Sequence, residues 1–275
     1  MIDKFYTFEG NEPGPTSVIL GGVHGNEICG VEAVEQTIQD VALQAGRLII
    51  GIANPKAIEL NVRQVEANLN RMFADPAHLS ETDLRSYEFD RAQEIRPLLD
   101  SASALLDIHA SFTPGARPFA ICEPNALGVA DRLPVDLLVS GFDEVEPGGT
   151  DYYMNSIGAV GICVECGYLG DKNTTEVALD SIRSFLVTRG HIEGRQHPVT
   201  AQEYIRMTSL YRTITDFTLA KPFGDFEELS DGQLIGTDGE LEVRSEGENV
   251  IVFARDRPAA EEEAFLLGSY TPSLV

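Results

Sequence analysis

The sequence predicts an α/β protein, with a mixed, mostly parallel sheet flanked by helices and a small β-rich C-terminal domain. Short apolar runs typical of buried strands alternate with helical patterns in the first two thirds of the chain. Beyond residue 198 the pattern changes to short strand-like runs separated by turns, and the Asp-Gly pair at 238–239 is a hairpin signal. The length of 275 residues fits one large or two unequal domains.

The individual elements follow from these patterns. Strands are expected near 17–23, 47–53, 104–109, 117–122, 136–141 and 159–165, and helices near 27–44, 87–100 and 174–189. Shorter strands are expected around 232–236, 241–244, 250–253 and 264–267. The segment GRQHP at 194–198 has the composition of a linker. We therefore predict an α/β domain over residues 1–195 and a β-rich domain over residues 196–275.

The charge balance excludes two classes of partner. Lys and Arg number 20 against 44 Asp and Glu, a formal net charge of −24. Such a surface repels nucleic acid and anionic membranes. The chain has no run of 18 apolar residues, so no membrane span is expected. No signal region is recognisable at the N-terminus, which favours a cytoplasmic protein, and the oligomeric state stays open.

The four cysteines indicate buried, reduced thiols, in keeping with a cytoplasmic protein. They are Cys29, Cys122, Cys163 and Cys166. The last two form a C-x-x-C motif within a predicted strand, where Cys163 and Cys166 point to opposite faces. This placement disfavours a redox motif or a structural zinc site.

A candidate metal site begins in the segment GGVHGNE at 21–27, between a predicted strand and a predicted helix. Strand ends that lead into helices are where α/β proteins place their sites. The imidazole of His24 and the carboxylate of Glu27 come from one tight turn and can supply two ligands of a zinc ion. A lone H-x-x-E motif is also common by chance, so further ligands are needed.

His109 is the candidate for the third ligand, because it ends another predicted buried strand. Parallel strands bring their carboxyl ends together, so His109 can reach the other two residues. Two His and one Glu leave one position open for water, as in catalytic zinc sites. The other histidines, His78, His191 and His197, lie in polar stretches and are expected to be solvated.

Two arginines and one glutamate extend the candidate site. Arg63 and Arg71 lie in the long irregular segment 54–86, and loops of that length are usually functional. Their guanidinium groups can bind carboxylates or stabilise an oxyanion, or they can form ordinary surface salt bridges. Glu165 ends the strand-like run 160–164. It is a candidate general base, and the alternative is a strand-end residue that caps a turn.

Together these motifs resemble the succinylglutamate desuccinylase/aspartoacylase family, a branch of the zinc carboxypeptidase-like fold. The matching segments occur in the family's order over about residues 15–190: GGVHGNE at 21–27, NP at 54–55, Arg63, LNRMF at 69–73, DIH at 107–109 and VECG at 164–167. The C-terminal region also resembles the family's second domain.

The resemblance implies a role for each residue and one Zn²⁺ per chain. His24, Glu27 and His109 would bind the zinc ion. Glu165 would activate the zinc-bound water and pass its proton to the leaving amine, and Arg63 would stabilise the oxyanion. Substrate binding would fall to a neighbouring pair, Asn70 and Arg71, which would hold a carboxylate.

Three positions depart from the family pattern. The family usually has Asp where this chain has Asn68, so the partner of the first zinc-binding His carries no charge. Aspartoacylases use an Arg about ten residues before the catalytic Glu, and the segment 151–161 contains none. Their C-terminal Tyr has no match near Ala259. These differences leave the acyl group and the amino acid open.

The function predicted is zinc-dependent hydrolysis of the amide bond of a small N-acyl amino acid. One alternative is a metallocarboxypeptidase-like hydrolase that acts on short peptides, with Arg71 holding the terminal carboxylate. Another is a non-catalytic binding relative that has kept the fold. Ester hydrolysis also stays open, as does the identity of the metal in cells.

Overall fold

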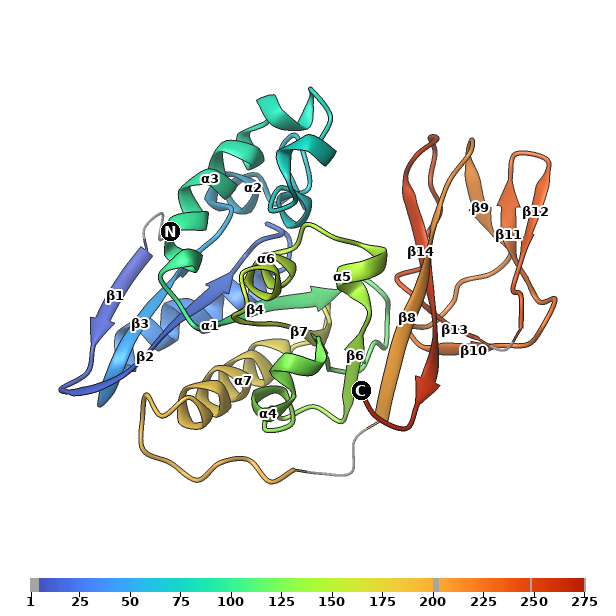
Figure 1. The fold of residues 1–275 in the computed structure, drawn as a ribbon. Helices are drawn as coiled ribbons and strands as arrows, with labels where there is room; N and C mark the ends of the chain where they lie inside the picture. Colours follow the sequence, from blue (N-terminus) through green and yellow to red (C-terminus); the bar gives the residue numbers. More distant parts are fainter. Residues whose placement is uncertain (1–4, 200–202, 248, 275) are drawn as a thin grey trace.

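A mixed eleven-stranded sheet runs through the whole molecule (Figure 1). The computed structural model describes residues 5–199, 203–247 and 249–274. The strand order in the sheet is β1-β3-β2-β4-β7-β5-β6-β8-β14-β13-β10. The strands of its first part are β1 (Phe5–Glu9), β2 (Glu12–Gly21), β3 (Ala45–Ile52), β4 (Ala104–Ser111), β5 (Phe119–Cys122), β6 (Leu137–Ser140) and β7 (Val160–Tyr168).

Parallel pairing dominates this first part of the sheet. Strands β3, β2, β4 and β7 pair in parallel, as do β5 and β6. Only β1 with β3 and β5 with β7 pair antiparallel there. Because β2, β4 and β7 are parallel neighbours, their carboxyl ends meet at one edge of the sheet.

Helices cover both faces of the sheet, as the apolar patterns predict (Figure 1). On one face, α1 (Ile28–Asp40) and α7 (Thr174–Thr188) pack on a core that includes Ile19, Leu106 and Ile162. On the other face, α3 (Tyr87–Asp100) packs on the alternate residues of the same strands, among them Leu20 and Leu105. The strands are buried on both faces, which explains why they read as continuous apolar runs.

Short helices fill the connections. They are α2 (Pro55–Leu60), α4 (Leu127–Ala130), α5 (Phe142–Val145) and α6 (Thr150–Ser156), with single 3₁₀ turns at Leu69–Arg71, Pro76–His78, Asp83–Arg85 and Pro124–Ala126. The segment 54–86, expected to be irregular, therefore contains one short helix and three of these turns.

The C-terminal region continues the same sheet. Its strands are β8 (Glu203–Arg212), β9 (Phe217–Leu219), β10 (Glu227–Leu229), β11 (Leu234–Asp238), β12 (Leu241–Arg244), β13 (Asn249–Val252) and β14 (Glu263–Thr271). Strand β8 pairs in parallel with β6, and β14, β13 and β10 follow. Strands β12, β11 and β9 form a separate small antiparallel sheet. The predicted domain boundary at residues 195 and 196 lies in a described segment without helix or strand. Strands from both sides of this boundary belong to the same eleven-stranded sheet.

Most of the predicted elements are confirmed, with ends displaced by a few residues. The Asp-Gly pair forms the β11–β12 hairpin, with Gly239 at a φ of 58°. The prediction that His191 is solvated is wrong: its ring is buried and contacts Ser17 Oγ at 2.8 Å and the carbonyl oxygen of Ala45 at 3.0 Å. Among the described helices, none has the length and apolar character needed to cross a membrane.

Glu88 fixes the loop that carries Arg63. Its side chain is fully buried at the start of α3 and accepts hydrogen bonds from the backbone N–H groups of Val65, Glu66 and Ala67 at 2.7, 3.2 and 3.0 Å. It also accepts one from Asn54 Nδ2 at 3.3 Å. The loop therefore has a defined course although it has little regular structure.

We predict that Glu88→Ala lowers the free energy of unfolding by about 2–4 kcal/mol, because buried backbone donors lose their acceptor. Urea denaturation measures the effect, and limited proteolysis should show earlier cleavage between residues 61 and 68. Glu94→Ala, on the exposed side of the same helix, is the control and should cost less than about 1 kcal/mol. Equal losses in the two variants would contradict the role of Glu88.

Candidate active site

A tight turn between β2 and α1 presents His24 and Glu27. Gly25 lets this turn pass close to α2, because a Cβ at this position would lie 2.2 Å from the backbone of Ala57. The Gly25 N–H donates to the carbonyl oxygen of Arg63 at 3.1 Å, which ties the turn to the arginine loop. Glu27 directly precedes α1, and its side chain is buried.

The three predicted ligands converge at the carboxyl ends of β2 and β4. The Nδ1 atoms of His24 and His109 lie 3.2 Å apart, and they lie 2.8 and 2.9 Å from the two carboxylate oxygens of Glu27. Two ligand atoms bound to one tetrahedral zinc ion are about 3.3 Å apart. Nitrogen atoms that face each other at this spacing, beside a carboxylate, fit the donor set of a cation. The three residues therefore fit a zinc ion.

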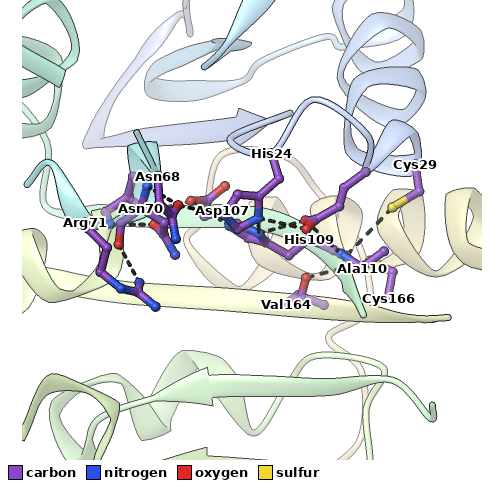
Figure 2. A network of polar contacts seen from close by, with 12 residues as sticks. His24, Cys29, Asn68, Asn70, Arg71, Asp107, His109, Ala110, Val164 and Cys166 are labelled. Atoms are coloured by element: carbon purple, nitrogen blue, oxygen red, sulfur yellow. Dashed lines mark hydrogen bonds and ion pairs between the residues drawn. The ribbon is translucent and has the colours of Figure 1, made fainter. Parts of the chain in front are cut away.

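Each imidazole also contacts a side-chain oxygen through its Nε2 atom (Figure 2). His24 Nε2 lies 3.0 Å from Asn68 Oδ1, which also accepts the backbone N–H of Asn70 at 3.0 Å. His109 Nε2 lies 3.2 Å from Asp107 Oδ2, and Thr150 donates its hydroxyl to that oxygen at 2.5 Å. Asn68 thus occupies the place expected for the partner of the first His. Burial, followed by the charge of Arg63, lowers the pKa of His24 to about 4, which keeps this imidazole neutral.

Glu165 lies beside His109 on the neighbouring strand. The two residues are partners in the parallel β4–β7 pair. Glu165 is 7% exposed, and among the described residues its Oε2 has no hydrogen-bond partner. Burial, followed by the charge of Glu27, raises the pKa of Glu165 to about 8 in the protein without metal. A buried, unpaired carboxylate of this kind can accept a proton.

Arg63 and Arg71 both reach the site, but with different partners. Arg63 Nη1 donates to Glu27 Oε1 at 3.0 Å. Arg71 forms an ion pair with Glu146 and donates through Nε and Nη2 to the two oxygens of Glu263, each at 3.1 Å. Asn70 lines the same cavity and accepts the backbone N–H of Thr150 at 3.2 Å. Arg71 is therefore already occupied by two carboxylates.

These residues line one cavity together with groups that the sequence did not single out. Asp225, in the C-terminal region, accepts hydrogen bonds from the hydroxyls of Ser111 and Thr113 at 2.6 and 2.9 Å. Asp225 does not itself line the cavity; the residues that do include Phe112, Phe142, Asp143, Glu146, Asp151, Phe253, Arg255, Glu263 and Phe265. No short sequence motif identifies these residues, because they come from several loops and strands that only tertiary packing brings together.

Of the positions that depart from the family pattern, Asn68, Asn155 (ten residues before Glu165) and Ala259 do not line the cavity, whereas Asp151 in the segment 151–161 does. Asn155 donates to Asp143 Oδ2 at 3.0 Å and accepts the backbone N–H of Gly161 at 3.2 Å. At the position where aspartoacylases are expected to have an Arg, this chain therefore has an amide that binds Asp143 and the backbone of Gly161. Ala259 is exposed in the loop before β14.

Asp143 and Asp151 form an acidic part of the wall. Burial, followed by the charge of Asp151, raises the pKa of Asp143 from 3.8 to about 7. Burial also raises the pKa of Asp151 to about 6. A carboxyl group whose pKa is raised by folding favours the folded state while it is protonated, and that contribution is lost as it ionises.

We therefore predict that Asp143→Asn becomes more stable relative to the parent protein as the pH rises from about 4 to about 7, with no further change above that range. Urea unfolding of the metal-free proteins at several pH values measures the difference. Asp216→Asn, at an exposed aspartate, reports the effect of removing charge alone. A difference between Asp143→Asn and the parent that is constant over this range would contradict the assignment.

Comparisons with known proteins agree with the fold and the motifs. A family model described as the succinylglutamate desuccinylase/aspartoacylase catalytic domain matches residues 13–187. Succinylglutamate desuccinylase from Vibrio cholerae is 26% identical over 91% of this chain and 79% of that protein. Aspartoacylase from Xenopus tropicalis is 36% identical over 33% of this chain and 32% of that protein.

The fold is also that of solved structures. The X-ray structure of succinylglutamate desuccinylase from Vibrio parahaemolyticus superposes with a TM-score of 0.79 at 18% identity, covering 97% of this chain and 86% of that one. The mixed sheet with helices on both faces and the small additional sheet are thus features of this fold. Because the family model matches more than half of the chain, the chain belongs to the succinylglutamate desuccinylase/aspartoacylase family of deacylases.

Proposed function

We propose that this protein is a zinc-dependent amidohydrolase that removes the acyl group from a small N-acyl amino acid. The observation that carries the proposal is the convergence of His24, Glu27 and His109 beside the unpartnered carboxylate of Glu165. A zinc ion held by the three ligands would lower the pKa of a water molecule to about 7 and polarise the substrate carbonyl. Related proteins named succinylglutamate desuccinylase and aspartoacylase support the substrate class.

The chain's own residues would divide the remaining work. Glu165 would accept the proton of the attacking water and donate it to the leaving nitrogen, because its carboxylate is buried, unpaired and next to His109. Arg63 would donate to the developing oxyanion, since its guanidinium is already oriented by Glu27. Asn70 and Arg71 would contact the substrate from the same wall, and Arg71 could bind a carboxylate there only by displacing Glu263.

We predict that His24→Ala loses both zinc and activity, whereas Glu165→Gln keeps about one zinc per chain and loses activity about 10²- to 10⁴-fold. Elemental analysis and hydrolysis of N-acyl amino acids provide the two measurements. Glu242→Gln, on the exposed strand β12, is the matched control and should keep both properties. Full activity in Glu165→Gln would refute the mechanism, and hydrolysis of dipeptides alone would favour a carboxypeptidase-like enzyme.

Asn68 tests how the neighbour of His24 affects the metal. We predict that Asn68→Asp raises zinc affinity, because a carboxylate increases the basicity of the imidazole it contacts, and that Asn68→Ala lowers it about 10- to 100-fold. Competition with a chelator of known affinity measures the change. Unchanged affinity in both variants would show that the 3.0 Å contact with His24 does not influence the metal.

A further inference from the structure

Arg255 is a positively charged residue of the cavity that forms no ion pair with any described residue. It follows β13 and lines the same cavity as His24, His109 and Glu165. Its guanidinium lies 4.6 Å from the centre of the Phe112 ring. Within the described part of the chain, its Nε is buried without a hydrogen-bond partner, and no carboxylate forms an ion pair with it.

The neighbouring arginines are all engaged. Arg63 donates to Glu27, and Arg71 is paired with Glu146 and Glu263. Arg257 donates to the carbonyl oxygen of Glu263. Among the described residues no carboxylate forms an ion pair with Arg255, although Glu146 and Glu263 line the same cavity and act on its charge. With 44 Asp and Glu in the chain, the lack of an ion pair at Arg255 does not reflect a shortage of acidic residues.

A partly buried cation without an ion-pair partner is costly to the fold. Burial, followed by repulsion from Arg63, lowers the pKa of Arg255 to about 9, so the side chain is still charged at neutral pH. Contact with the face of Phe112 offsets only part of the lost hydration. A ligand carboxylate would restore two hydrogen bonds in the fork geometry that guanidinium and carboxylate share.

We propose that Arg255 binds the carboxylate of the substrate, so that the C-terminal region supplies the anchor for the amino acid. The inference rests on the proposed function, which requires a carboxylate on the substrate. Arg71 is less suited to the first contact, because a substrate carboxylate must displace Glu263 from a bidentate pair. Arg255 needs no such exchange, because none of the described carboxylates forms an ion pair with it.

The test compares ligands that differ only in the carboxylate. N-acetyl and N-succinyl amino acids are paired with their C-terminal amides, and KM and kcat are measured with the zinc-loaded enzyme. In the parent protein the acids should be preferred. In Arg255→Met the KM for the acids should rise about 10- to 100-fold, the loss expected for a charge-assisted hydrogen bond, with kcat changed little. The KM for the amides should stay the same.

Three variants separate binding from stability. Arg255→Lys should keep part of the preference, because it keeps the charge but not the fork. Arg244→Met removes one exposed positive charge on β12 and should keep the full preference. Arg255→Met should be at least as stable as the parent protein in thermal unfolding, since it removes a partly buried charge without an ion-pair partner; a large loss of stability would point to a structural role.

Binding measured in the Glu165→Gln background distinguishes the two proposals. In one outcome the parent protein hydrolyses no N-acyl amino acid, but the Glu165→Gln variant binds the acids better than the amides and Arg255→Met abolishes this preference. The proposed function then fails and the assignment of Arg255 stands. If hydrolysis occurs but Arg255→Met keeps the acid preference, the assignment of Arg255 is overturned. Loss of the preference in Arg71→Met alone would place the carboxylate on Arg71.

Discussion

The carboxylate of Glu27 is the contact on which the geometry of the site depends. Its two oxygens meet His24, His109 and Arg63, and one of them also accepts the backbone N–H of Ala110 at 3.2 Å. A single buried side chain thus joins the turn after β2, the end of β4 and the arginine loop. Such a group is tolerated in the core only because every oxygen is paired. Its position at the start of α1 fixes these three segments relative to one another.

The sheet provides the second constraint. Parallel pairing of β2, β4 and β7 brings the ligands and Glu165 to one edge, although they are far apart in the sequence. The pairing of β6 with β8 then carries the sheet into the C-terminal region. As a result Arg255 and Glu263 face residues of the first part of the chain across one cavity.

The sequence predicted the fold class, and it predicted that the motif residues lie at strand ends, because each depends on local signals. Apolar runs identified the central strands, and H-x-x-E, D-I-H and V-E-C-G identified side chains at their ends. It did not predict the partners of Arg71, since Glu146 and Glu263 are ordinary acidic residues whose proximity arises only from tertiary packing. Glu88 was missed for a similar reason, because its role is to accept backbone hydrogen bonds from a distant loop. Burial of His191 likewise depends on Ser17, which is 174 residues away.

The division of the cavity wall between two stretches of sequence has a consequence for how the family can diversify. The groups proposed for metal binding and proton transfer lie before residue 166, whereas Phe253, Arg255, Glu263 and Phe265 come from one loop and one strand near the C-terminus. Changes in that short stretch can alter the size and charge of the substrate pocket without disturbing Glu27 and its partners. This part of the pocket can then vary while the residues proposed for metal binding and proton transfer stay unchanged.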